Sequence, residues 1–216
     1  MNAKLEAVST VTEQADTAPT RRRTVAIAVA LVVLLVVAGG AWALLRGGDE
    51  TAPYADDAAT GRLTLCDADG KAVTEGAIKD APFAAYVVGS TAAPAAYQGA
   101  SQTASLYAYQ PREGHAADEF SGQILAASSR YTSTAHPAAQ VTDQSSTLAD
   151  FVAAYPAEWD GFVELRLILT VEGNTPRASE YDALDLQIEG DRWHVVGATG
   201  GADCAGVADT TSNAIS

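Results

Sequence analysis

Residues 161–172 read GFVELRLILTVE and decide the fold that we expect for this chain. Every second side chain in the stretch is apolar: Val163, Leu165, Leu167, Leu169 and Val171. The positions between them include Glu164 and Arg166, so the pattern has the two-residue period of a β-strand with one face in a core. The length and the apolar character of the run predict a central strand of an antiparallel sheet.

Shorter runs on both sides predict further strands. They are residues 62–66, 83–89, 104–110, 120–132, 184–188 and 193–195. Residues 120–132 also fit a helix, but their Ser, Thr and Tyr content favours a strand. Gly190-Asp191 suits a two-residue hairpin turn between the last two strands. One helix is expected over Thr147–Tyr155, where Thr147 and Asp150 match a capping box and Pro156 ends the pattern.

This set of elements predicts a mainly β domain over residues 62–204. We expect an antiparallel β-sandwich or an α+β sheet domain with one short helix, and the strand spacing favours the sandwich. The small and polar residues 205–216 are expected to form a disordered tail.

A different stretch, Thr24–Leu45, is free of charge and reads TVAIAVALVVLLVVAGGAWALL. At about 1.5 Å per residue it is long enough to cross a bilayer as a single transmembrane helix, which would make the lipid bilayer its partner. A cleaved secretory signal is the alternative, because Ala41-Trp42-Ala43 imitates a cleavage site. The long segment before the run favours an uncleaved anchor.

The orientation follows from Lys4 and Arg21 to Arg23, which precede the run, whereas only Arg46 and Arg62 follow it closely. The positive-inside rule places residues 1–23 in the cytoplasm as a disordered tail and the C-terminal domain outside the cell membrane. Residues 46–61 are rich in Gly, Asp and Ala, and we expect them to form a flexible linker.

The chain has two cysteines, Cys66 and Cys204, near the two ends of the expected domain. Outside the membrane an even number of thiols points to one disulfide. A zinc site with His115, His136 or His194 is the weaker alternative, because no paired spacing of ligands occurs.

Charge limits the partners. Residues 46–216 carry 24 acidic and nine basic side chains, and such a domain repels nucleic acid. The Asp67-Ala68-Asp69-Gly70 sequence lacks the register of a calcium loop and indicates a turn. Neither a cofactor nor a metal site is expected.

Glu158, Asp160 and Glu164 flank Trp159, as carboxylates flank a sugar-binding ring in a glycosidase, but a turn beside the core explains them as well. No nucleophile motif or phosphate loop occurs, so no catalytic residue is assigned. The aromatic residues that could contact a ligand are Tyr107, Tyr109 and Trp159.

The strings LTLCDADGK, SLYAYQPREG, AAYPAEWDG and YDALDLQIEGDRW resemble uncharacterised bacterial secreted or single-pass proteins with an exterior domain bounded by two cysteines. The resemblance covers residues 62–204 and implies topology only.

Three hypotheses of function follow. The first is a tethered, non-enzymatic module that binds an envelope protein or glycan. The second is an envelope glycan hydrolase that uses the acidic residues near Trp159. The third is an assembly or signalling component that associates through its span, where Gly39-Gly40 permits close helix contact.

Overall fold

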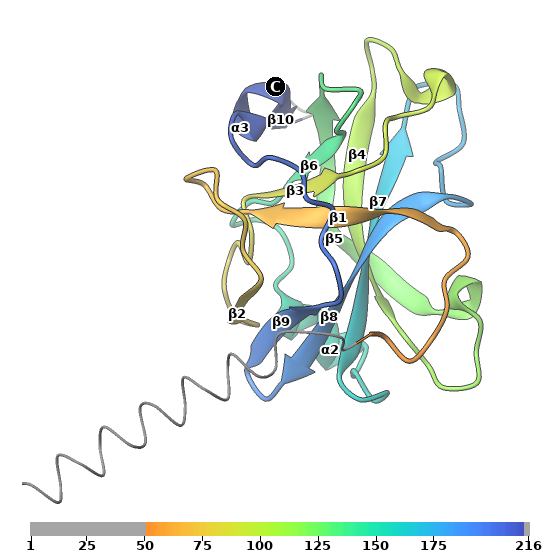
Figure 1. Cartoon of the computed structure of the whole chain (residues 1–216), viewed down its shortest axis with the longest axis vertical. Coiled ribbons are helices and arrows are strands. Elements are labelled where there is room, and N and C mark those ends of the chain that lie inside the picture. Colours follow the sequence, from red (N-terminus) through yellow and green to blue (C-terminus); the bar gives the residue numbers. More distant parts are fainter. Residues whose placement is uncertain (1–50, 214–216) are drawn as a thin grey trace, which may run out of the picture. The chain divides into compact units, whose positions relative to one another are not determined.

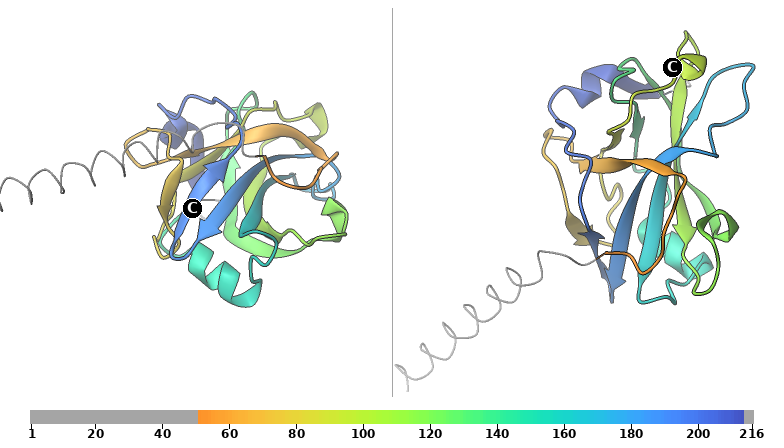
Figure 2. Two further views of the ribbon diagram at one scale, coloured as in Figure 1. Left: turned by 60° about the horizontal axis from the view of Figure 1, so that its bottom comes forward. Right: turned by 45° about the vertical axis from the view of Figure 1, so that its right-hand side comes forward.

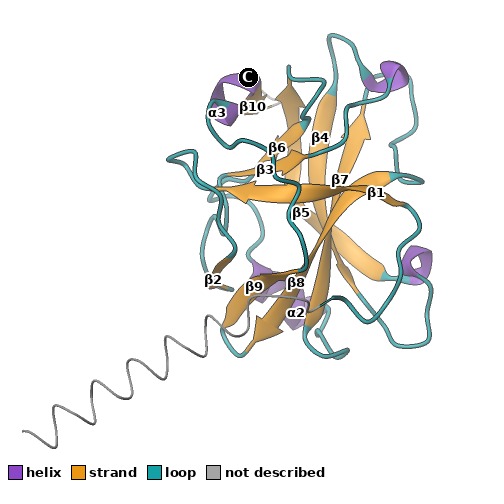
Figure 3. Ribbon diagram, in the orientation of Figure 1, coloured by secondary structure: helices purple, strands orange, loops and turns teal. Residues whose placement is uncertain are grey.

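The computed structural model describes residues 51–213, which form a mainly β domain (Figures 1 and 3). The expected span Thr24–Leu45, the tail before it, residues 46–50 and the last three residues lie outside the described part. Within residues 51–213, no helix combines the length and the apolar composition that a membrane crossing needs.

Ten strands make up the sheet. Their bounds are β1 Ala59–Cys66, β2 Glu75–Ala77, β3 Tyr86–Gly89, β4 Thr103–Gln110, β5 Ser121–Tyr131, β6 Ala138–Gln140, β7 Phe162–Thr170, β8 Tyr181–Glu189, β9 Arg192–Val196 and β10 Thr211–Asn213. The strand order is β10-β5-β4-β7-β8-β1-β3-β6, and β9 pairs with both β8 and β2. The β7 strand lies between β4 and β8, which confirms the central antiparallel strand expected from its sequence.

The sheet curls until it is nearly closed, and β1 makes this possible. Its first half pairs in parallel with β8, and its second half, from Leu63 onwards, pairs with β3 in the antiparallel sense. Figures 1 and 2 show β1 crossing the long strands at a steep angle. At the far end of the curl, the Gln140 backbone N–H donates to Ser129 Oγ at 2.8 Å, which joins β6 to β5. The strands thus form one curled sheet and not the two separate sheets of a sandwich.

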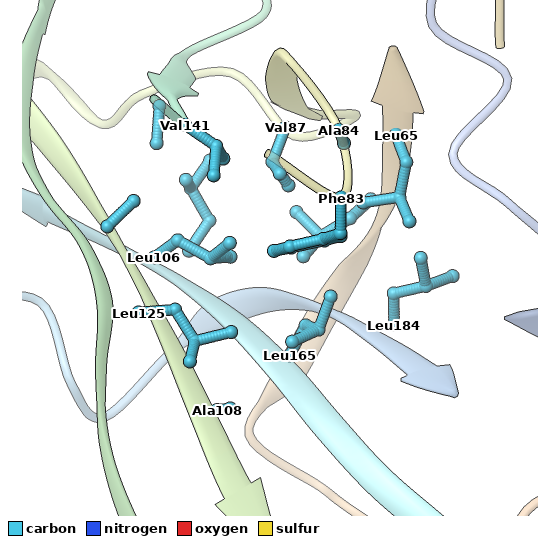
Figure 4. Packing of buried hydrophobic residues seen from close by; sticks show 14 of the residues in the cluster. Leu65, Phe83, Ala84, Val87, Leu106, Ala108, Leu125, Val141, Leu165 and Leu184 are labelled. Atoms are coloured by element: carbon cyan, nitrogen blue, oxygen red, sulfur yellow. The ribbon is translucent and has the colours of Figure 1, made fainter. Parts of the chain in front are cut away.

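The core fills the inside of the curl. Leu65, Leu106, Leu165 and Leu184 come from four different strands, and Figure 4 shows their side chains pointing into a common interior. Trp193, 1% exposed, packs against Phe83 at one end of this core. The alternating pattern that predicted β7 therefore marks the face that the core buries.

The helical pieces are short and lie around the sheet (Figure 3). The expected helix is confirmed as α2, Leu148–Ala154, and the Thr147 side chain accepts from the Asp150 N–H in a complete capping box. The remaining pieces are the 3-10 turns η1 (Ala95–Tyr97) and η2 (Ala117–Glu119) and the four-residue α3 (Val207–Thr210).

The chain after Cys204 departs from the expected disordered tail. Val207 of α3 is buried, and β10 pairs with the end of β5. Cys66 and Cys204 form the expected disulfide, with Cα atoms 5.5 Å apart. The bond fixes the start of this C-terminal segment to β1, so a stretch that is too small and polar to hold itself in place is ordered by its neighbours.

Candidate functional site

Residues 51–58, here called the N-terminal strap, lie on the outer face of β7 and β8 and precede β1 (Figure 1). The strap is fastened by Tyr54, whose ring centroid lies 5.2 Å from that of Phe120, 5.6 Å from Trp159 and 6.4 Å from Phe162. The Tyr54 hydroxyl donates to Asp185 Oδ1 at 2.5 Å. The expectation of a flexible linker over residues 46–61 therefore does not hold for residues 51–61. Tyr54 and the start of β1 hold these residues on the domain.

The strap covers a buried ion pair on β7. Glu164 and Arg166 point away from the core, yet only 1% of Glu164 and 4% of Arg166 are exposed. Arg166 Nε donates to Glu164 Oε1, and Arg166 Nη2 donates to the Ala117 carbonyl oxygen at 2.8 Å. The two faces of β7 are thus both buried, one by the core and the other by the strap and the η2 loop.

Two tyrosines hold the Arg166 guanidinium between them. Its central carbon lies 3.9 Å from the ring centroid of Tyr109 on β4 and 4.6 Å from that of Tyr181 on β8. The electron-rich faces of both rings attract the cation. Strand register explains the meeting, because Arg166 stands opposite Tyr107 on β4 and Ala183 on β8. Tyr109 and Tyr181 lie two positions along these strands, on the same face and diagonal to Arg166.

Burial changes the acidity of the carboxyl groups under the strap. It raises the pKa of Glu164 to about 8, although the neighbouring Arg166 opposes the change. Burial also raises the pKa of Asp185, while the hydrogen bond from Tyr54 and the charge of Arg62 oppose that change. Burial thus favours the protonated form of Glu164, while the charge of Arg166 favours the carboxylate.

A cleft with a volume of about 620 Å³ opens beside this cluster. Its lining combines the strap, the η2 loop, the loop before β8 and three strand residues: Ala55, Asp56, Asp57, Ala58, Tyr109, Ala116, Ala117, Asp118, Arg166, Ala178, Ser179 and Tyr181. Because four of the lining residues belong to the strap, the cleft exists only when the strap lies on the sheet.

The cleft presents hydrogen-bond donors and acceptors side by side. The Arg166 guanidinium lines the cleft, where its Nε and Nη2 groups are fixed by Glu164 and by the Ala117 carbonyl oxygen. The carboxylates of Asp57 and Asp118 are exposed at the rim. Asp56 Oδ1 accepts from the Ala58 N–H at 3.1 Å, which holds the strap wall in its bend. This mixture of groups can orient a polar ligand.

The structure brings two of the three expected ligand-contact aromatics together. Tyr109 lines the cleft, and the Tyr107 ring stacks on it with centroids 6.4 Å apart. Trp159 lies instead in the aromatic cluster around Tyr54 and is absent from the cleft lining.

Sequence reasoning missed Arg166, Tyr181 and the strap. The one signal for Arg166 was a charged residue within the most apolar strand.

The carboxylates considered for glycan hydrolysis are separated. Glu158 and Asp160 are exposed in the turn before β7, whereas Glu164 is buried under the strap and does not line the cleft. Asp160 has a φ of 51° and Gly161 a φ of 81°, as a tight turn into a strand requires. The turn interpretation of this segment fits the geometry better than a pair of catalytic carboxylates.

The residues considered for a calcium site and for a zinc site have structural roles instead. Asp67 Oδ1 accepts from the N–H groups of Asp69 at 2.9 Å and Lys71 at 2.8 Å, so the Asp-Ala-Asp-Gly sequence forms the expected turn. The disulfide removes both cysteines from any zinc site. Among residues 51–213, no group of three or more His, Cys, Asp or Glu side chains is placed to hold a metal ion.

Comparison with known proteins gives no relative for this chain: no family model, no curated protein and no solved structure matches it. Any functional argument therefore rests on the site itself.

Replacing Tyr54 with phenylalanine tests how the strap is held. The ring contacts remain, but Asp185 loses its hydrogen bond inside the covered cluster, and we expect the free energy of unfolding to fall by about 1–2 kcal/mol. Tyr155→Phe is the matched control, because the Tyr155 hydroxyl makes no hydrogen bond within residues 51–213 although its ring stacks on Phe151. Urea unfolding followed by tryptophan fluorescence measures both variants, and equal losses would contradict a special role for the Tyr54 hydroxyl.

Proposed function

We propose that the protein is a membrane-tethered, non-enzymatic binding module that works outside the cell membrane. It binds a protein or a glycan of the envelope in the cleft between the N-terminal strap and the η2 loop. The tether is the run Thr24–Leu45, and the orientation with the N-terminus in the cytoplasm comes from the basic residues before it. The domain then faces the envelope space.

The observation that carries the proposal is the position of Arg166. Its guanidinium is 4% exposed, is held by Glu164, by the Ala117 carbonyl oxygen and by two tyrosine rings, and still lines the cleft. A guanidinium that is fixed on several sides and still lines a cleft is arranged as the preorganised donor of a binding site.

The stability of the fold does not require this arrangement. A buried ion pair contributes little to stability compared with well-packed apolar residues, because both groups lose their hydration. The strap that covers Glu164 and Arg166 also forms one wall of the cleft. A role in binding therefore explains this pair better than a role in stability, since ionisable groups with shifted pKa values are frequent at functional sites.

Binding is favoured over hydrolysis by the location of Glu164. With a pKa of about 8 it is the carboxyl group best suited to donate a proton at neutral pH. It is nevertheless covered by the strap and faces Arg166, not the cleft. A ligand in the cleft would meet the guanidinium and the rim carboxylates of Asp57 and Asp118.

Site-specific photo-cross-linking of the full chain in its membrane tests the proposal. A photoreactive amino acid is placed at Ala116 or Ala178, two exposed positions that line the cleft, or at Asp143, an exposed position outside the cleft, as the control. We expect adducts with an envelope component from positions 116 and 178 and at least tenfold less from position 143. Equal adducts from all three positions, or none from positions 116 and 178, would refute the cleft as the binding surface.

A further inference from the structure

We infer that the ligand of the cleft is an uncharged saccharide, held through neighbouring hydroxyl groups. The inference rests on the proposed function and adds the chemical class of the ligand. Three properties of the cleft lead to it: the pairing of donors with acceptors, the sign of the local charge, and the occupation of the tyrosine faces.

The first property is that donors and acceptors line the cleft together. The Arg166 guanidinium lines it as a fixed and buried donor group, while Asp57 and Asp118 offer carboxylate oxygens at the rim. The hydroxyl of Ser179, also on the rim, both donates and accepts. A sugar hydroxyl does the same, so adjacent hydroxyls on a ring can accept from Arg166 and donate to a carboxylate. Such charge-assisted hydrogen bonds are the strong ones.

The second property is the sign of the charge, which disfavours an anionic ligand. The lining contains three aspartates and one arginine. Residues 51–213 as a whole carry 22 acidic and eight basic side chains, a net charge of −14. A phosphate or a uronic acid would approach against this field and then lie beside the rim carboxylates.

The third property disfavours a cationic ligand. The faces of Tyr109 and Tyr181 that could attract an ammonium group already hold the Arg166 guanidinium, at 3.9 and 4.6 Å. A ligand cation on the floor of the cleft would therefore meet a like charge, which is fixed and buried. An uncharged ligand with many hydroxyls avoids both conflicts.

The size of the cleft agrees with this class. Its volume of about 620 Å³ lies within the range of small-molecule sites. It suits roughly one or two sugar rings, while longer glycans would extend past the rim formed by Asp118 and Ser179.

The test uses the full chain in lipid nanodiscs and calorimetric titration with disaccharides. The uncharged probes are maltose, cellobiose, lactose and diacetylchitobiose. The charged probes of matched size are chitobiose, which carries amines, and a disaccharide that contains glucuronic acid. We expect saturable binding of at least one uncharged probe and at least tenfold weaker binding of both charged probes.

Variants tie the binding to the cleft. Asp57→Asn and Asp118→Asn each replace an exposed carboxylate on the rim, and each is expected to weaken binding of the uncharged probe about tenfold. Asp143→Asn is the control, because it removes the same charge outside the cleft and should leave the affinity unchanged. An equal effect of all three substitutions would overturn the inference.

The remaining outcomes separate the inference from the proposed function. Binding of charged probes alone, or of no disaccharide while positions 116 and 178 still form photo-adducts, would refute the saccharide and leave the binding module standing. The absence of both disaccharide binding and adducts from these positions would refute both proposals.

Discussion

Replacing Cys66 and Cys204 together with alanine is expected to lower the free energy of unfolding by about 4–5 kcal/mol, the largest stability effect that we predict. The disulfide joins residues 138 positions apart, so it removes much of the freedom of the unfolded chain. It also holds the segment that leads to Val207 and β10, which has few apolar contacts of its own. For a domain of this size, such a loss is a large part of the total stability.

The measurement is urea unfolding of the full chain, with the oxidised protein, the reduced protein and the double alanine variant compared. Both sulfur-bearing residues are buried, at 0% and 4% exposure, so alanine is used in preference to serine, which would bury a hydroxyl. The reduced protein and the variant should show nearly the same midpoint. A loss below about 1 kcal/mol in the variant would contradict the role assigned to the bond.

The second large effect is a fall in stability as the pH rises through the pKa of Glu164. The pKa in the folded protein, about 8, lies above the ordinary value of 4.5. A carboxyl group with a raised pKa contributes stability that is complete below the unfolded pKa and is lost as the pH rises through the folded one. We therefore expect the free energy of unfolding to drop by roughly 4 kcal/mol between pH 5 and pH 9.

Several charged groups around Glu164 affect its pKa and so the pH dependence of stability. Arg166 on the same strand favours the anion, whereas Asp56 of the strap and Asp185 of β8 oppose it. Asp185 also has a raised pKa, so its own ionisation lowers stability in the same direction. Tyr54, which covers the cluster, has its pKa raised by burial and stays neutral throughout this range.

The variant Glu164→Gln separates Glu164 from the other groups. Glutamine is neutral and can still accept from Arg166 Nε, so the variant should match the wild type near pH 4, below the ordinary pKa of 4.5, and be more stable than the wild type at pH 9. Urea unfolding at both pH values gives the comparison. If the variant is instead less stable by the same amount at both values, Glu164 is ionised throughout and the ion pair stabilises the fold.

Much of the fold could be predicted because its longer elements repeat a simple pattern. Val163 to Leu169 alternate in and out of the core, and the Gly190 turn connects β8 to β9 as expected. The short strands β2, β6 and β10 have three residues each and are made largely of small or polar residues, so no periodicity could reveal them. They exist because neighbouring strands offer them hydrogen-bond partners.

The candidate site was less predictable. Tyr109 could be named because it stands on the polar side of an alternating strand. The strap could not, since Tyr54 is a single aromatic among Ala, Asp and Pro, and its partners Phe120, Trp159 and Phe162 are 66 to 108 positions away in the chain. A local pattern contains no information about contacts at that separation.

The sequence by itself therefore determined the β character of the domain, its central strand, its one short helix with the Thr147 cap, and the pairing of its two cysteines. These features depend on local periodicity, on capping chemistry and on the number of thiols. Only the tertiary structure decided that β1 turns from β8 to β3 and nearly closes the sheet. It alone also decided that residues 51–58 fold over Glu164 and Arg166, and that a cleft opens there. The physical reason is that burial of the second face of β7 depends on which distant segment covers it, and that choice is made by packing and not by the local sequence.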